Sequence, residues 1–186
     1  GNGKQVEPEF ETLYIWDGAA YDNLGLESLG KFRQGFELRK EINYLIVSDA
    51  SQPLYCSASH FRNPKRLIDV TMDQVRALRA RTIIDYFSNN KLKGSYFQIG
   101  NTSGYIINAL KATTPDMIKN ETLQQDYLSE VDVKRAASYP TTLKKMKKSD
   151  FSLIFRHGWE AANTTLMAYN SEIHQNKTFS DKWGVL

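Results

Sequence analysis

The sequence predicts an α/β fold in which a mostly parallel sheet is flanked by helices. Short apolar runs at residues 12–16, 44–50 and 95–99 each meet an acid or a glycine at their carboxyl end, which is typical of strands. Two longer segments, 64–88 and about 150–172, carry apolar residues at helical spacing. Because strands and helices alternate along the chain, a parallel sheet is the expected arrangement.

The first predicted strand leads to Asp17. Residues 1–11 are polar and irregular and predict a loop, and the run 12–16 then predicts a strand with an acid at its carboxyl end. Open α/β sheets place their active sites at that end of the strands. Gly18 follows at once and would allow a sharp turn under the acid, because glycine reaches backbone conformations that other residues avoid. Residues 24–40 are expected to hold short helical turns.

The second strand and a long helix form the middle of the chain. Residues 44–50 are almost continuously apolar, which predicts burial on both faces, as in a parallel sheet. Asn63 and Pro64 suit the N-cap and first turn of the helix at 64–88. That helix carries both arginines and acids, and ion pairs within it are the simplest account of them. The residues concerned are Arg66, Asp69, Asp73, Arg76, Arg79 and Arg81.

The C-terminal half is predicted to be mainly helical. After the strand at 95–99, the short run at 105–107 predicts a fourth strand or a loop segment. Residues 111–140 predict short helices, and 141–148 predict one more, with its lysines on a solvated face. Ser149 and Asp150 are suited to cap the last long helix.

Length and composition indicate one domain, or a large part of one. The chain has 186 residues, a net charge of +3 and a single cysteine, Cys56. So small a charge requires no nucleic-acid partner, and one cysteine forms no disulfide within the chain. The sequence shows no segment apolar for long enough to cross a bilayer. We expect one domain over 12–174 and a tail over 175–186, in a cytoplasmic protein with peripheral contact to a membrane.

The phrase at 16–29 resembles a known family block. It reads Trp-Asp-Gly-Ala-Ala-Tyr-Asp-Asn-Leu-Gly-Leu-Glu-Ser-Leu and is similar to the Asp-Gly-Gly/Ala block of bacterial patatin-like phospholipases. Several blocks in one order are more specific than a single motif. The resemblance covers nearly all of 12–170 and implies the C-terminal part of a patatin-like three-layer fold. The further matching blocks lie at 44–50, 66–81, 139–143 and 156–160.

The resemblance implies a Ser-Asp dyad that hydrolyses fatty acyl esters of phospholipids or related lipids. Asp17 matches the general base of that dyad, and Gly18, Ala19 and Asn23 match residues of its loop. Such a base takes the serine proton during attack, returns it to the leaving alcohol and then activates water. No metal or organic cofactor is implied. Asp49, at the end of the next strand, is expected to cap its own turn or to support the catalytic loop.

The nucleophile of such a dyad is missing from this sequence. No Gly-x-Ser-x-Gly occurs, and the nearest imitation, Gly-Asn-Thr-Ser-Gly at 100–104, has its serine one place late. Ser103 follows a predicted strand, but no helix is expected after it, so we do not expect it to be the nucleophile. In the family, the serine and the oxyanion loop precede the aspartate block. We therefore expect this chain to be the C-terminal portion of a longer protein and to have no dyad activity alone.

Other interpretations remain open at this stage. Asp17 could be a turn residue that caps the next element. Asp17 and Asp49 both follow strands and could bind Mg²⁺ for phosphoryl transfer, although no Asp-x-Asp spacing is present. The chain could also be a non-catalytic α/β module that binds lipid or acts as a scaffold. His60, His157 and His174 show no metal-binding spacing, and the sequence leaves a Ser-His-Asp triad open; His157 is expected to be packed within its helix.

Overall fold

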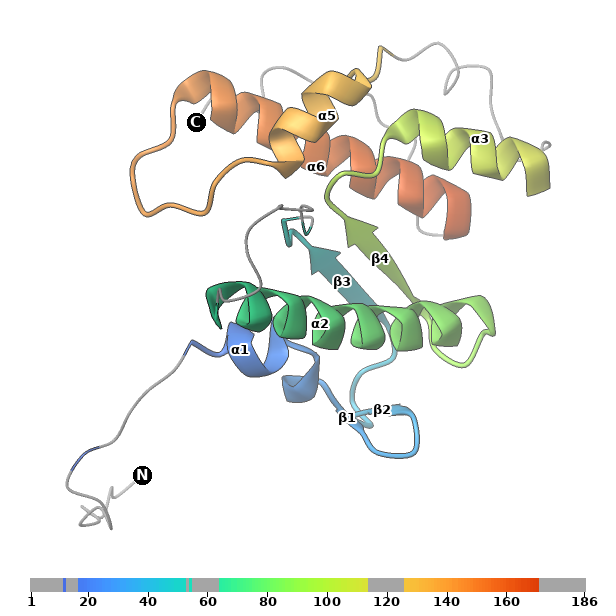
Figure 1. Cartoon of the computed structure of the whole chain (residues 1–186). Coiled ribbons are helices and arrows are strands. Elements are labelled where there is room, and N and C mark those ends of the chain that lie inside the picture. Colours follow the sequence, from blue (N-terminus) through green and yellow to red (C-terminus); the bar gives the residue numbers. More distant parts are fainter. Residues whose placement is uncertain (1–11, 13–16, 53, 55–63, 114–125, 171–186) are drawn as a thin grey trace, which may run out of the picture.

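The computed structural model describes residues 12, 17–52, 54, 64–113 and 126–170, which form a mixed α/β structure (Figure 1). A pair of strands lies between two groups of helices. The predicted α/β class is therefore confirmed for the described residues. The first group contains α1 (Ala19–Asp22) and α2 (Pro64–Ser88), and the second contains α3 (Ser103–Thr113), α5 (Glu130–Ala137) and α6 (Lys148–Tyr169).

The central strands are β3 (Leu45–Asp49) and β4 (Gly94–Gln98), which pair in parallel. Leu45 lies opposite Gly94, and Asp49 lies opposite Gln98. Helix α2 joins the two strands, since a parallel pair needs a long crossover connection. The sequence predicts both strands to within a residue or so, and it predicts the bounds of α2. The strand expected at 12–16 and the N-cap expected at Asn63 lie outside the described residues.

The segment 24–40 differs from the predicted helical turns. It contains one short 3₁₀ turn, η1 (Leu26–Ser28), followed by an antiparallel hairpin of β1 (Gly30–Phe32) and β2 (Phe36–Leu38). The facing rings of Phe32 and Phe36, 4.7 Å apart, stabilise the hairpin. Gly35 in the turn has φ +134°, and a Cβ there would lie 1.9 Å from the hydroxyl of Tyr86, so glycine is required at this position.

Two apolar clusters hold the described elements together. The first joins α2 to β3 and the hairpin, and the second joins α3 to α6. Both depend on residues at helical or alternating spacing, which is why the sequence pattern predicts most of these elements. The first contains Leu26, Phe36, Leu45, Val47 and Ile83, and the second contains Ile106, Ile107, Leu110, Met167 and Ala168.

Burial on both faces of β3, expected from its apolar run, is wrong for the described chain. Leu45, Val47 and Asp49 are buried, whereas Ile46 is 57% exposed and Ser48 is also exposed. Residues of a strand point alternately to its two faces, and α2 with the hairpin covers one of them. Helix α6 packs against β4, and the described helices leave the second face of β3 open.

Three predictions for the C-terminal half are also wrong. Residues 105–107 belong to α3, because a short apolar run does not distinguish strand from helix. Residues 141–147 are not helical; the Thr142 hydroxyl accepts the backbone N–H of Lys144, which favours a turn instead. Helix α6 begins at Lys148 without a side-chain cap, and Asp150 accepts a hydrogen bond from Arg135 at 2.8 Å.

His157 connects α6 to the turn after β4. Its side chain is 1% exposed, and its Nε2 accepts the backbone N–H of Gly100 at 3.0 Å. This confirms the packed, hydrogen-bonded role predicted for His157. Burial disfavours the charged imidazolium and lowers the pKa of His157 below its ordinary value of 6.5.

The lowered pKa of His157 predicts acid sensitivity of the fold. Below about pH 6.5 the unfolded chain takes up a proton that the native chain does not, so stability is present above that pH and lost as the pH falls. The free energy of unfolding should decrease by up to about 1.4 kcal/mol per pH unit in that window. His157→Gln keeps an acceptor for the Gly100 N–H but does not titrate. Urea unfolding at several pH values should therefore give a flatter profile for this variant, and parallel profiles would contradict the assignment.

Candidate active site

Asp17 lies two residues before α1, next to the N-cap Gly18, and is exposed to solvent. Its Oδ1 accepts the backbone N–H of Ala19 at 2.9 Å, and its carbonyl accepts the N–H of Ala20 at 3.0 Å. These are the contacts of a turn residue, one of the interpretations left open by the sequence. They use one carboxylate oxygen, and within residues 17–52, 64–113 and 126–170 the structure records no bond to Oδ2.

The chain does turn at Gly18, but the turn does not use the conformational freedom of glycine. Gly18 is the N-cap of α1 with φ −57° and ψ −26°, an ordinary right-handed conformation, and a Cβ there would meet nothing within 4 Å. The glycine that needs its conformational freedom is Gly25, whose φ is +66° in the left-handed region. Neither the backbone nor the described neighbours require glycine at position 18.

Asn23 ties the Asp17 loop to the carboxyl end of β3. Its Nδ2 donates to the Oγ of Ser51 at 2.7 Å. Ser51 in turn donates its backbone N–H to Oδ1 of Asp49 at 3.0 Å, so Asp49 caps its own turn as predicted. The structure therefore links Asn23, Ser51 and Asp49. It records no contact between the carboxylates of Asp17 and Asp49 among the residues it describes.

Asp49 is a buried anion with a full set of partners. Its side chain is 2% exposed, and Oδ2 accepts hydrogen bonds from Arg76 Nη1 at 2.6 Å and from the Tyr96 hydroxyl. Burial opposes ionisation, but the hydrogen bonds from Ser51 and Tyr96 and the charge of Arg76 outweigh it and hold the pKa of Asp49 below its usual value. Burial and the same anion raise the pKa of Tyr96, so the tyrosine keeps its proton.

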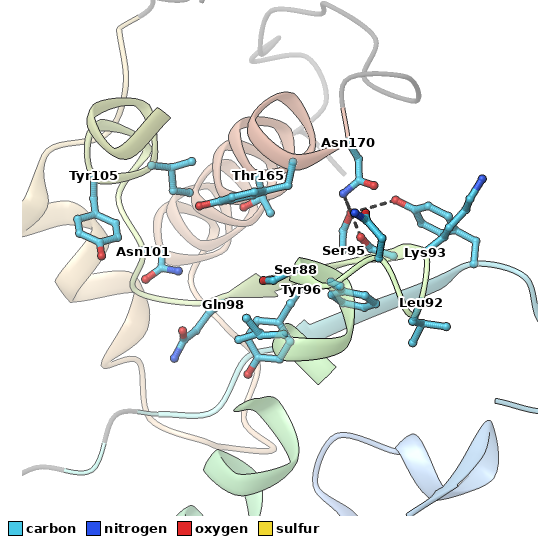
Figure 2. Close-up of a pocket in the computed structure, with 17 residues that line it drawn as sticks. Ser88, Leu92, Lys93, Ser95, Tyr96, Gln98, Asn101, Tyr105, Thr165 and Asn170 are labelled. Atoms are coloured by element: carbon cyan, nitrogen blue, oxygen red, sulfur yellow. Dashed lines mark hydrogen bonds between the residues drawn. The ribbon is translucent and has the colours of Figure 1, made fainter. Parts of the chain in front are cut away.

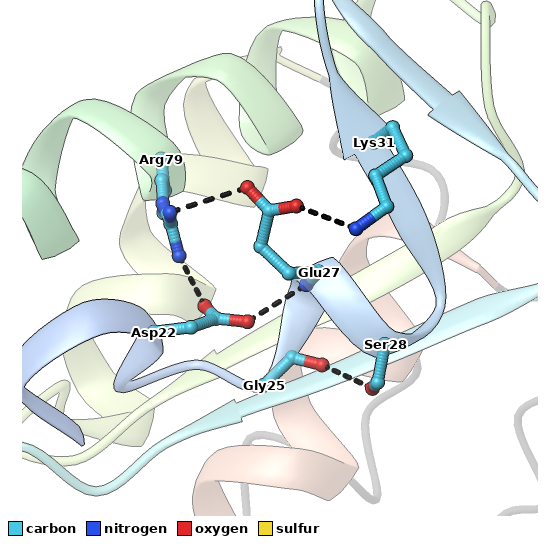
Figure 3. Close-up of polar contacts among 6 residues, drawn as sticks. All are labelled: Asp22, Gly25, Glu27, Ser28, Lys31 and Arg79. Atoms are coloured by element: carbon cyan, nitrogen blue, oxygen red, sulfur yellow. Dashed lines mark hydrogen bonds and ion pairs between the residues drawn. The ribbon is translucent and has the colours of Figure 1, made fainter. Parts of the chain in front are cut away.

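Arg79 binds two acids of the 16–29 phrase, as Figure 3 shows. Its Nη1 lies 2.5 Å from Asp22 Oδ1, and its Nη2 lies 3.3 Å from Glu27 Oε1. Asp22 Oδ2 also accepts the backbone N–H of Glu27 at 2.7 Å, and Lys31 lies 3.3 Å from the second Glu27 oxygen. The guanidinium stacks over the ring of Tyr21 at 5.3 Å. This cluster fixes the segment that follows Asp17.

Ion pairs within α2, which the sequence predicted, account for only some of the contacts of its arginines. Arg76 does pair with Asp73, three residues away, at 2.6 Å. However, Arg76 also binds Asp49, and Arg79 binds Asp22 and Glu27 far along the chain. This role of Asp22 and Glu27 was not predicted from the sequence, since their partner is more than 50 residues away and no local spacing indicates it.

Helix α3 begins at Ser103, after β4 and its turn, so the prediction that no helix follows Ser103 is wrong. The strand–turn–helix arrangement of a nucleophile elbow is therefore present. However, the Ser103 side chain is 3% exposed, and its Oγ is enclosed and has no hydrogen-bond partner among the described residues. An enclosed hydroxyl cannot meet an ester, so burial is the better reason against Ser103 as nucleophile.

The described residues hold no group of three or more His, Cys, Asp or Glu side chains that could bind a metal. The Mg²⁺ alternative also loses Asp49 as a free ligand, because both of its oxygens are bonded within the protein. Cys56, His60 and His174 lie outside the described residues. Among the helices of the described ranges, none combines the length and apolarity needed to cross a membrane.

Comparisons with known proteins provide no relative for this chain. No family model, no curated protein and no solved structure matches it. The functional interpretation consequently depends on the chain's own residues and on the geometry given above.

The two glycines of the phrase give a matched pair of variants. Gly25→Ala should lower the free energy of unfolding by about 1–2 kcal/mol, because an L-residue is strained in the left-handed region. Gly18→Ala should not lower it, since Gly18 already has a right-handed conformation. A Cβ meets no atom within 4 Å at either position. The difference in urea unfolding between the two variants therefore measures the cost of backbone strain alone. Equal losses would contradict the left-handed assignment.

Removal of the Arg79 cation should destabilise the fold. Arg79→Met leaves Asp22 and Glu27 partly buried without their shared partner, and we expect a loss of about 2–3 kcal/mol in the free energy of unfolding. Arg81→Met in the same helix is the control, because Arg81 is exposed and bonds only its own helix in the described structure. Its loss should stay within about 0.5 kcal/mol. If chemical denaturation gave the two variants similar losses in the free energy of unfolding, the ion pairs of Arg79 would not be what stabilises the fold.

Proposed function

We propose that the protein is a patatin-like serine lipid acyl hydrolase in which Asp17 is the general base. The observation that carries this assignment is the geometry of Asp17. Its carboxylate is exposed at the start of α1, with one oxygen held by Ala19 and the other available. The loop around it is tied to the carboxyl end of β3 through Asn23 and Ser51, at the end of the sheet where α/β enzymes place their catalytic groups.

In this mechanism Asp17 acts directly on a serine, without a histidine. The carboxylate accepts the hydroxyl proton as the serine attacks an acyl ester, and it returns the proton to the leaving alcohol. It then deprotonates the water that hydrolyses the acyl-enzyme. The serine and the oxyanion donors must come from outside these 186 residues, since no Gly-x-Ser-x-Gly is present. Gly18, exposed and with open space around it, would leave room beside the base for the serine and the ester.

The same proposal accounts for the remaining features of the site. Asn23 positions the loop, and Asp49 supports it from the protein interior through Ser51. The helices on either side of β3 and β4 are compatible with the C-terminal part of a three-layer patatin-like domain. The substrate class that follows is a phospholipid or another fatty acyl ester, reached at a membrane surface by peripheral contact. No cofactor enters the reaction.

Asp17→Asn is the direct test, made in the longer protein that includes the sequence upstream of Gly1. We expect kcat for a phospholipid or p-nitrophenyl acyl ester to fall by about 10²–10⁴-fold, because a general base is lost. Labelling of the serine by a fluorophosphonate probe should fall in parallel. The free energy of unfolding should stay unchanged, since the Asp17 side chain is exposed.

Asp69→Asn is the matched control, because Asp69 is an exposed aspartate of α2. It should leave hydrolysis and labelling unchanged. The 186-residue chain alone should show neither. Hydrolysis by this chain alone that disappears in Asp17→Asn would contradict the need for an external serine. Full activity of Asp17→Asn in the longer protein would remove Asp17 from the mechanism and favour a non-catalytic role.

A further inference from the structure

A groove of about 680 Å³ runs along the outer edge of β4, as Figure 2 shows. The C-terminal part of α2 lines it on one side of the strand, with Ile84 and Phe87. Helices α3 and α6 line it on the other side, with Tyr105 and Tyr169, which are 69% and 70% exposed. The groove thus lies beside a strand, between two layers of helices, where a neighbouring strand of the sheet would lie.

The backbone of β4 offers hydrogen bonds to this groove. The N–H of Leu45 donates to the carbonyl of Lys93, and the N–H of Ile99 donates to the carbonyl of Asp49. Backbone groups alternate in direction along a strand, so the odd-numbered residues of β4 face β3. The N–H and C=O groups of Gly94, Tyr96 and Gln98 therefore face the groove.

These edge groups are only partly used in the described structure. The side-chain amide of Asn170 donates to the Gly94 carbonyl at 3.0 Å, in the manner of an N–H from a neighbouring strand. The Gln98 carbonyl has a long contact of 3.4 Å with the N–H of Asn101. Within the described ranges no further strand pairs with β4 at Tyr96, whose N–H and C=O groups both face the groove. Unpaired backbone groups of this kind are the template for strand addition.

We propose that this groove binds an extended peptide segment of a partner protein, which adds to β4 as a further strand. Strand addition supplies the missing partners of Tyr96 and Gln98 in a way that no apolar ligand can. Alternate side chains of the peptide then contact the apolar walls, Phe87 and Ile84 on one side and Tyr105 on the other.

Charge complementarity indicates an acidic residue or a C-terminal carboxylate in the bound segment. Lys93 is the one charged side chain among the described residues that line the groove, and no carboxylate lines it. A second, shallower hollow continues from the same end and adds Lys91. Lys93 and Asn170 lie toward one end of the groove and Gln98 and Asn101 toward the other (Figure 2), so the peptide's acid belongs at the Lys93 end.

The experiment uses random seven-residue peptides displayed on phage and selected on the immobilised protein. We expect enrichment of sequences with an acidic residue, and synthetic copies of them should bind in fluorescence anisotropy. Gln98→Pro removes one groove-facing N–H while leaving the bonds to β3, because proline is tolerated on an edge strand where its nitrogen faces outward. It should weaken binding at least about tenfold, as expected when a buried acceptor loses its donor.

Gln98→Ala is the matched control, since it shortens the same side chain but keeps the N–H; binding should stay within about threefold of the unsubstituted protein. Lys93→Glu should weaken acidic peptides at least about tenfold through like-charge repulsion. Circular dichroism checks that each variant is folded. Absence of enrichment, or equal binding by the proline and alanine variants, would overturn strand addition. Dimerisation that only Gln98→Pro abolishes would assign the edge to a second copy instead, and peptide binding that is present in the 186-residue chain but absent from the longer protein would assign it to the protein's own upstream segment.

Discussion

The arrangement of the described chain depends on the buried carboxylate of Asp49. It belongs to β3, and it binds Arg76 of α2 and Tyr96 of β4, so one anion connects three elements. Loss of Arg76 would leave this charge buried without a cation beside it, which is among the most destabilising changes a protein interior can undergo. The same group reaches the surface through Ser51 and Asn23. The buried carboxylate of Asp49 thus helps to position the loop around Asp17.

The residues of the 16–29 phrase separate into two groups when their contacts are compared. Asp22 and Glu27 share Arg79, and Gly25 provides a left-handed residue, so the fold explains why they are present. Asp17 and Gly18 are exposed and have no partner in the described structure beyond their own turn. The fold does not require either residue, and both are compatible with the proposed role of Asp17 as a general base as well as with a simple turn.

Elements with a clear apolar pattern and marked ends were predictable from the sequence, and elements that are very short or depend on a few contacts were not. Helix α2 was predictable because its apolar residues repeat over 25 residues, and β3 and β4 were predictable because each is a short apolar run with an acid or a glycine at its carboxyl end. The β1–β2 hairpin has three-residue strands, and the turn at Thr142 depends on one hydroxyl, so neither has enough pattern to be distinguished from helix. Within the site, the link from Asn23 to Ser51 and the pairs of Arg79 join distant segments, and no local spacing encodes them.

The Asn170 amide has a consequence for the handling of the protein in solution. An exposed strand edge invites uncontrolled pairing between molecules and so promotes aggregation. The Asn170 amide bonds the Gly94 carbonyl and so occupies the first hydrogen-bonding position of the β4 edge. Helices on both sides of the strand also restrict the approach of another sheet. The side chain that protects this edge also lines the groove beside it, so protection against aggregation and access to the groove both depend on Asn170.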